Sequence, residues 1–251
     1  MLTLSTDSLK GYGLNRIFEL AKEAGYDGID LQVEPDLYDT QNTEYIRKLS
    51  KEYELPIQAV KARYDANSPR EVTEAIEMAK ELDAKVVVIQ PPKLLNFKFV
   101  GWLKKEIPKL RTKERISIAL ENAPSKTFLG IFPERALSNL AELKEFKHAC
   151  IDTSRVAEKS EDIMRVYKSL RNYLVHIHLS NVNRGKKYAM PQEGILPLES
   201  LLAKLKQDQY PGAISIKVKP KFLDAGNDEK VIKHLKECKE FYEKYYVNVD
   251  A

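Results

Sequence analysis

The chain alternates short apolar runs with longer amphipathic segments from one end to the other, and this alternation limits its possible folds. Between the runs, apolar residues recur at helical spacing, as at Leu14, Ile17 and Phe18, and Ser68 followed by Pro69 predicts a helix start. Eight runs are typical of buried parallel strands: Leu2–Leu4, Gly28–Leu31, Ile57–Val60, Val86–Ile89, Ile116–Leu120, Ala149–Asp152, Leu174–Leu179 and Ala213–Val218.

The number of these units favours one fold class. Eight strand-helix units in 251 residues match a closed (β/α)8 barrel, whereas a doubly wound sheet usually has about five or six strands. The two longest connections, 122–133 and 180–197, each follow a strand, and no Gly/Ser/Pro-rich linker or charge block divides the chain. We therefore predict an α/β protein in which residues 1–251 form a single TIM barrel.

Composition and charge exclude several classes of protein. The net charge of +4 comes from 41 basic and 37 acidic residues that are interspersed along the chain, so we expect no nucleic-acid partner. No apolar run approaches the roughly 18 residues of a membrane span, and the N-terminus lacks a signal-peptide pattern, so we expect a cytoplasmic protein. Cys150 and Cys238 lie in apolar patterns far apart and are predicted to be core residues. The oligomeric state stays open.

Polar residues follow nearly every predicted strand, at the end of a barrel where active sites are built. Any one of them is explained by the start of a loop, but together they predict a site. Alternation along the strand points His176 and His178 inward, and we expect His176, one layer deeper, to be a core residue. The strand-end residues are Asp7, Glu34, Lys61, Arg63, Gln90, Glu121, Asn122, Asp152, Arg155, His178, Asn181, Lys217 and Lys219.

Three of these strand-end residues form a candidate metal site. Glu121 and Asp152 offer carboxylate oxygens and His178 offers an imidazole nitrogen, which are ligands suited to Mg, Mn, Co or Zn. They follow successive predicted strands, so a closed barrel would bring them to one end.

Short motifs extend this reading along the whole chain. They are residues 24–31 (A-G-Y-D-G-I-D-L), 84–89 (A-K-V-V-V-I), 120–122 (L-E-N), 152–154 (D-T-S), 176–181 (H-I-H-L-S-N), 191–198 (P-Q-E-G-I-L-P-L) and 210–217 (Y-P-G-A-I-S-I-K). In this order they resemble motifs of the xylose isomerase-like barrel superfamily. That superfamily includes sugar-phosphate isomerases and epimerases, hydroxypyruvate isomerase, inositol-catabolism enzymes and the endonuclease IV type of abasic-site nuclease.

The resemblance implies a changed metal site. In the metal-dependent isomerases Glu, Asp, His and Glu hold the cation, and the fourth matching position here is Lys217. A charged lysine cannot ligate a divalent ion and repels it. Gln90 and Arg155 stand where relatives commonly have histidine, and Tyr188 replaces a loop histidine. Most ligands of the three-metal nuclease cluster are therefore missing, and we do not expect nuclease activity.

Three hypotheses follow for the site. In the first, Lys217, alone or with Arg155, supplies the charge of the lost metal by pairing with Glu121 and Asp152. The protein then acts as, or descends from, a sugar phosphate isomerase or epimerase that moves a proton next to the carbonyl of a small sugar or hydroxy-keto acid. Glu121 would act as base, and Lys217, with a pKa lowered by burial, would act as acid, second base or carbonyl-trapping amine. The residues expected to bind substrate are Lys61, Arg63, Gln90, Arg155, Tyr188 and Glu193.

The second hypothesis is a barrel without catalysis that binds a small anion or a protein partner through its strand-end cations. In the third, a divalent metal still binds weakly through Glu121, Asp152 and His178, with Glu193, Gln90 or water completing the shell. The expected cofactor is thus none or a weakly bound Mn, Mg, Co or Zn ion, and the expected partner is a small anionic or sugar ligand.

Overall fold

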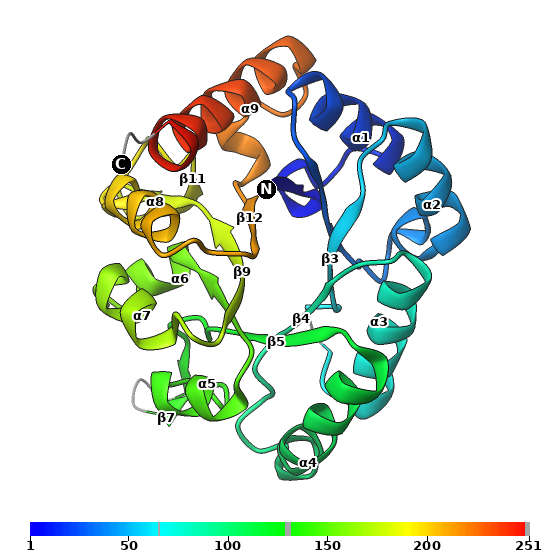
Figure 1. Cartoon of the computed structure of the whole chain (residues 1–251), viewed down its shortest axis with the longest axis vertical. Coiled ribbons are helices and arrows are strands. Elements are labelled where there is room, and N and C mark those ends of the chain that lie inside the picture. The colour runs from blue at the N-terminus through cyan, green and yellow to red at the C-terminus, as the bar shows by residue number, and fades with distance from the viewer. Residues whose placement is uncertain (65, 129–131, 249–251) are drawn as a thin grey trace.

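Eight parallel strands close into a barrel in the computed structural model, which describes residues 1–64, 66–128 and 132–248. Their order around the barrel is β1-β12-β9-β8-β5-β4-β3-β2. The helices form the outer ring (Figure 1), so the predicted (β/α)8 barrel is confirmed. The strands are β1 (Leu2–Ser5), β2 (Gly28–Gln32), β3 (Ile57–Lys61), β4 (Val86–Ile89), β5 (Ser117–Glu121), β8 (Ala149–Asp152), β9 (Leu174–Leu179) and β12 (Ala213–Ile216).

All eight predicted strands are present, but several extend further toward their carboxyl ends than their apolar runs do. β3 includes Lys61 and β5 includes Glu121, because the parallel hydrogen-bond ladder continues past the last apolar residue. Gln32, for example, still pairs with Lys61. The last strand is shorter than predicted and ends at Ile216. The barrel sheet itself therefore presents charged side chains at its carboxyl end.

The helices follow from amphipathic spacing and local caps. The Ser68 side chain accepts a hydrogen bond from the backbone N–H of Glu71, as the Ser-Pro pair predicts, and Asn139 forms a capping box with Glu142. The helices are α1 (Leu14–Glu23), α2 (Thr43–Glu52), α3 (Pro69–Glu81), α4 (Phe97–Glu114), α5 (Leu140–Phe146), α6 (Thr153–Glu158), α7 (Ile163–Leu170), α8 (Leu198–Gln207) and α9 (Asp228–Tyr242). Single turns add η1 (Thr6–Leu9), η2 (Tyr38–Gln41), η3 (Pro220–Phe222) and the π-helical η4 (Glu243–Val247).

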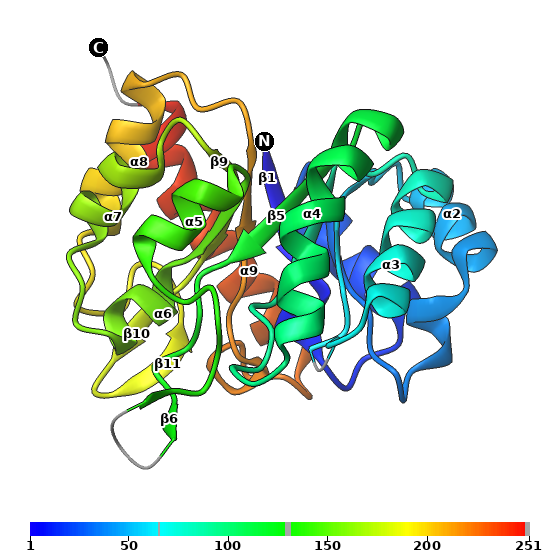
Figure 2. The ribbon, with the colours of Figure 1, turned by 90° about the horizontal axis from the view of Figure 1, so that it is seen from below.

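The two longest connections each carry a small hairpin at the same end of the barrel. Residues 122–133 contain β6 (Thr127–Phe128) and β7 (Phe132–Pro133), with 129–131 outside the described residues, and 180–197 contain β10 (Asn181–Asn183) and β11 (Lys186–Ala189). Figure 2 shows β6, β10 and β11 at the end opposite the N-terminus. The loops that follow the strands thus gather around the carboxyl mouth.

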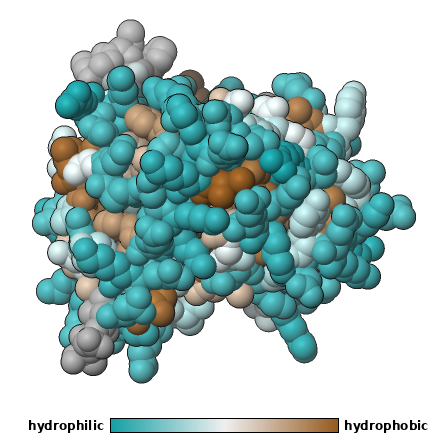
Figure 3. Space-filling model, turned by 90° about the horizontal axis from the view of Figure 1, so that it is seen from above, coloured by the Kyte–Doolittle hydropathy of each residue, from teal (hydrophilic) through white to brown (hydrophobic). Residues whose placement is uncertain are grey.

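Most of the apolar core lies between the strands and the surrounding helices. Cys150 and Cys238 are both fully buried, as predicted. The face in Figure 3 is mostly hydrophilic, with hydrophobic residues in separate small patches. No helix in the described part of the chain combines the length and apolar character needed to cross a membrane.

Two glycines provide a matched test of this packing. A Cβ atom on Gly28 in β2 would lie 2.7 Å from the backbone oxygen of Pro56, whereas a Cβ on Gly101 in α4 would meet nothing within 4 Å. We expect Gly28→Ala to lower the free energy of unfolding by about 1–3 kcal/mol. We expect Gly101→Ala to raise it by roughly 0.5–1 kcal/mol, because alanine is the better helix former. Urea unfolding measures both, and equal stability of the two variants would contradict the described register.

Candidate functional site

Buried charged side chains meet inside the carboxyl end of the barrel. Glu121, Asp152 and His178 belong to strands that neighbour one another in the sheet, and Lys217 directly follows β12. The structure therefore brings together the four residues that the sequence singled out. The other members of this cluster are Lys61 at the end of β3, Gln90 after β4 and Arg155 in α6, and all seven are at most 4% exposed.

Glu121 is the centre of the cluster. Its carboxylate is fully buried, and burial alone would raise its pKa, but Arg155, Lys217 and Lys61 outweigh burial and hold the pKa well below its usual range. The carboxylate therefore stays charged and has little tendency to accept a proton. Its partners are Arg155 Nη1 (2.7 Å), Lys217 Nζ (3.3 Å), Lys61 Nζ (3.4 Å), His178 Nδ1 (2.5 Å) and the donating Nε2 of Gln90.

Asp152 is the second anchor of the cluster. Its Oδ2 lies 2.8 Å from Lys217 Nζ, and its Oδ1 accepts the backbone N–H of Arg155 at 3.2 Å, which caps α6. The side chain of Asn122 holds the backbone on both sides, accepting from Asp152 N at 2.7 Å and donating to Asp152 O at 3.1 Å. Burial alone would raise the pKa of Asp152, but Lys217 and Arg155 outweigh burial and lower that pKa below its ordinary value. This carboxylate is therefore also charged.

The two buried lysines respond in opposite directions. Burial lowers the pKa of Lys217, but Asp152 and Glu121 outweigh burial and raise that pKa well above its ordinary value. This corrects the expectation that burial lowers the Lys217 pKa. Among the described residues, Lys61 forms an ion pair with Glu121, which it shares with Lys217 and Arg155. The pKa of Lys61 is lowered, chiefly through burial. Lys61 is therefore the more readily deprotonated amine.

A pocket of about 650 Å³ opens above the cluster. Lys61, Arg155, Lys217 and Tyr188 line its floor, whereas Glu121 and Asp152 do not line it. Its described lining includes eight cationic side chains against two carboxylates, so the mouth is strongly positive. The cations are Lys10, Lys61, Lys126, Arg155, Lys187, Lys217, Lys219 and Lys221, and the carboxylates are Asp7 and Glu158.

Tyr188 covers one side of the pocket floor. The amine nitrogens of Lys217 and Lys219 lie 5.3 and 5.4 Å from the centre of its ring, within reach of a cation–π interaction. Burial and the nearby Asp152 raise the pKa of the Tyr188 hydroxyl, so it keeps its proton. The structure thus places Tyr188 beside the cluster, where the sequence analysis expected a substrate-binding residue.

Three residues expected to bind substrate do not line this pocket. Gln90 is buried in the cluster, where it donates a hydrogen bond to Glu121, and the other two lie elsewhere. Arg63 lines a separate pocket with Glu71 and Glu74 of α3. Glu193 is not among the residues lining the 650 Å³ pocket, and its charge acts on the thiol of Cys238 in α9. A side chain after a strand can turn toward either the mouth or the helices, and the sequence alone does not say which.

Sequence reasoning missed Asp30 as a site residue. Its carboxylate is fully buried inside the barrel, with Oδ2 2.9 Å from His178 Nε2 and 3.4 Å from His176 Nε2. The available signal was an acidic residue in the middle of the strand Gly28–Gln32, at a position whose alternation points inward. Asp30 lies in the motif of residues 24–31, which the sequence analysis used only for the family resemblance.

Two of the expected metal ligands, Glu121 and Asp152, are already paired with Lys217. Lys217 Nζ lies within 3.3 Å of both Glu121 and Asp152, so a divalent ion between these carboxylates would meet an ammonium group. Within the described residues, two other triads bring ligand atoms within 4.8 Å of one another, and Asp152 belongs to neither. They are Glu121, Cys150 and His178, and Asp30, His176 and His178.

Known proteins match this chain over nearly its full length. A family model described as xylose isomerase-like TIM barrel matches residues 18–240. An uncharacterized protein of Mycobacterium tuberculosis strain H37Rv is 23% identical over 255 residues, covering 90% of this chain and 91% of that protein.

Solved structures share the fold at low sequence identity. A D-tagatose 3-epimerase-like protein superposes with a TM-score of 0.75 at 22% identity and covers 99% of both chains. The IOLI protein, solved with a zinc atom, superposes with a TM-score of 0.70 at 16% identity, covering 98% of this chain and 99% of its own. At these identities the likeness establishes the fold.

The lowered carboxylate pKa values predict acid sensitivity. Glu121, Asp152 and Asp30 have folded-state pKa values below those of the unfolded chain, near 4, so their stabilisation is present above about pH 4 and is lost as the pH falls below it. We expect the free energy of unfolding, measured in urea between pH 7 and pH 3, to drop on the acid side. Glu121→Gln should flatten that drop, and an unchanged slope would contradict the described ion pairs.

Replacing Lys217 should destabilise the protein, because its buried carboxylate partners would lose a compensating charge. We expect Lys217→Met to lower the free energy of unfolding by about 3–5 kcal/mol, because Asp152 loses its closest cation. Asp152→Asn combined with Lys217→Met should cost clearly less than the sum of the single changes. Lys105→Met, on the exposed side of α4, serves as the control and should change stability by less than about 0.5 kcal/mol. Additive losses would contradict direct pairing.

Proposed function

This chain belongs to the xylose isomerase-like TIM barrel family, and on that basis we propose that its barrel mouth binds a small anionic sugar or hydroxy-keto acid and moves a proton next to its carbonyl group. The observation that carries the proposal is the pocket of about 650 Å³, with eight cationic and two acidic side chains among its described lining. Its volume lies in the range of small-molecule sites, about 300–1,000 Å³. A phosphate or carboxylate group would complement its charge.

The exposed rim and the buried floor of this pocket suit different parts of a ligand. Lys126, Lys187, Lys219 and Lys221 are exposed on the rim and would attract the anionic group. Lys61, Arg155 and Lys217 are buried beneath them, in surroundings where an electrostatic interaction is stronger than in water. The carbonyl group would therefore lie on the floor and the anionic group at the rim.

The charge states on the floor favour particular roles. Lys61 has the lowered pKa and borders the pocket, so its neutral amine is the favoured base for the proton next to the carbonyl. Arg155 and Lys217 stay charged and would stabilise the developing enolate oxygen. Tyr188 keeps its proton and would donate a hydrogen bond to the substrate. Glu121 would hold these cations in place instead of acting as base.

A second candidate function is binding without turnover. The observation in its favour is that both cluster carboxylates lie beneath the cations and do not line the pocket. Measurements of binding and of hydrogen exchange separate the two functions, because a protein that only binds the ligand would not exchange the ligand's hydrogens.

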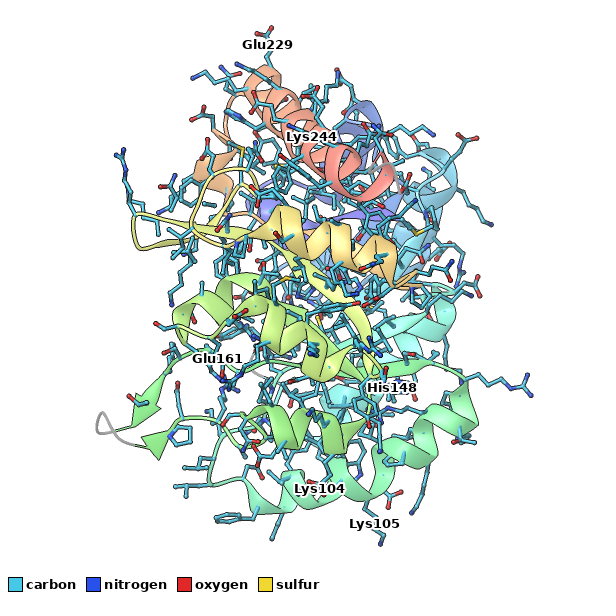
Figure 4. The ribbon with its side chains drawn as sticks, turned by 60° about the vertical axis from the view of Figure 1, so that its left-hand side comes forward. Lys104, Lys105, His148, Glu161, Glu229 and Lys244 are labelled. Carbon is cyan, nitrogen blue, oxygen red and sulfur yellow. The ribbon has the colours of Figure 1, made fainter. Side chains whose placement is uncertain are left out.

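The binding part is tested with anions of increasing size. Titration calorimetry would compare inorganic phosphate, a panel of sugar phosphates and hydroxy-keto acids, and the uncharged parent sugars. We expect only the anions to bind, and more weakly at high salt. Lys219→Met should weaken binding about tenfold, as loss of one charged hydrogen bond does. Lys105→Met, whose side chain projects from α4 away from the barrel (Figure 4), should leave it unchanged. Equal binding of uncharged sugars would contradict the anionic class.

The catalytic part is tested by hydrogen exchange in heavy water. For a bound compound, we expect NMR to show exchange of the hydrogen next to the carbonyl, faster with rising pH as Lys61 loses its proton. Lys61→Arg keeps the positive charge but supplies no base at these pH values, so exchange should fall by about 100-fold or more while binding changes little. Binding without exchange in the wild type would establish the second candidate, and full exchange in Lys61→Arg would exclude Lys61 as the base.

A further inference from the structure

The interior of the barrel has an apolar half and a polar half. The apolar half consists of Ala59, Val86, Val88, Ala119 and Cys150. The polar half lies on the neighbouring strands β9, β12, β1 and β2, where the sheet register pairs Ser215 with His178 and with Thr3, and Ser5 with Asp30. Its members, Thr3, Ser5, Asp30, His176, His178 and Ser215, are at most 1% exposed.

Polar atoms in this half lack protein partners. Among the described residues, no hydrogen-bond partner is found for Asp30 Oδ1, His176 Nδ1, His178 Nε2 and the hydroxyl oxygens of Thr3, Ser5 and Ser215. Buried polar groups in proteins are nearly always satisfied, by protein atoms, water or an ion. We therefore expect a water molecule or an ion to bind these atoms in the polar half of the interior.

Asp30 has no lysine or arginine ion-pair partner among the described residues. The described ion pairs of Asp30 involve only His176 and His178, whereas Glu121 and Asp152 each contact lysine and arginine. A buried carboxylate is strongly destabilising unless a cation or a metal compensates it. Nitrogen atoms of two imidazoles converge on the single oxygen Oδ2, at 3.4 and 2.9 Å.

The orientation of His178 suits a metal ligand. Its Nδ1 lies 2.5 Å from the charged carboxylate of Glu121, so Nδ1 carries a proton and donates it in a hydrogen bond. Its Nε2 lies 2.9 Å from Asp30 Oδ2 but outside hydrogen-bonding geometry. If an ion displaces the proton from Nε2, the lone pair of Nε2 lies beside Oδ2, as it does when both atoms bind one ion. A carboxylate that orients a metal-bound histidine through its other nitrogen is a common arrangement.

We propose a divalent metal site inside the barrel, formed by Asp30 Oδ2, His176 Nε2 and His178 Nε2. Two ligands of a tetrahedral zinc ion lie about 3.3 Å apart, close to both nitrogen–oxygen distances here. A hydroxyl of Ser5 or Ser215, or a water molecule, completes the shell. Two histidines and one carboxylate suit a first-row ion such as zinc, cobalt or ferrous iron.

This site differs from the metal set expected from the sequence. It shares only His178 with that set, and it uses the opposite nitrogen of the ring from the one that faces Glu121. The ion would neutralise Asp30 from within the barrel and would take the place of a proton on His178 Nε2. The inference does not rest on anion binding or turnover at the mouth, and zinc content is measured independently of both.

The test uses the full-length protein produced in zinc-supplemented medium, because the site is fully buried and must fill during folding. After dialysis against metal-free buffer, mass spectrometry should find about one zinc ion per chain. We expect Asp30→Asn and His176→Gln to lose the ion, with zinc content falling at least tenfold. Asp152→Asn and Cys150→Ser, matched changes at neighbouring buried positions, should retain it, with folding of each variant confirmed by circular dichroism.

Cobalt makes the test independent of variant folding. Wild-type protein produced with cobalt should show visible absorption bands of a low-symmetry site without a thiolate-to-cobalt charge-transfer band. A thiolate band would place the ion at Glu121, Cys150 and His178 and overturn the proposal. Absence of both metals from folded wild type would overturn it too, and would identify a protonated His178 as the partner of Asp30. Equal loss of zinc in Asp152→Asn and Asp30→Asn would also contradict the assignment.

Discussion

The carboxylate of Glu121 is fully buried, and the arrangement of the carboxyl end of the barrel follows from how that charge is compensated. Lys61, Arg155 and Lys217 reach it from three different parts of the chain, and Gln90 and His178 complete its shell. A buried carboxylate without such partners would favour unfolding by several kcal/mol. Side chains distant in sequence can contact the two carboxylate oxygens of Glu121 because the strand ends of the closed barrel form a ring.

This compensation also decides what the mouth presents to a ligand. The cations lie above the carboxylates, so the negative charges are covered and the positive ones line the pocket. In a site built for a metal ion, the carboxylates would face the ligand and the ion would supply the positive charge. Here Lys217 stands between Glu121 and Asp152, and its ammonium group lies where an ion between the two carboxylates would have to bind.

Deeper in the barrel the charge pattern is different. Asp30 has only histidines as described ion-pair partners, and the neighbouring strands offer hydroxyl groups instead of apolar side chains. His178 connects the two levels, because one ring nitrogen faces Glu121 and the other faces Asp30. The orientation of the His178 ring therefore depends on the charges of both Glu121 and Asp30.

Sequence by itself determined the strand-helix order, the barrel, and the inward positions of Glu121, Asp152 and His178, because these follow from periodicity and from motifs that are local in the chain. The resemblance to the family motifs also implied a changed sign at Lys217. Tertiary structure decided which lysine is easier to deprotonate: Lys217 lies close to two carboxylates, whereas Lys61 shares one with two other cations. It also placed Asp30 beside the histidines and turned Arg63 and Glu193 away from the mouth. These outcomes depend on distances between side chains from separate strands and loops, which no local pattern encodes.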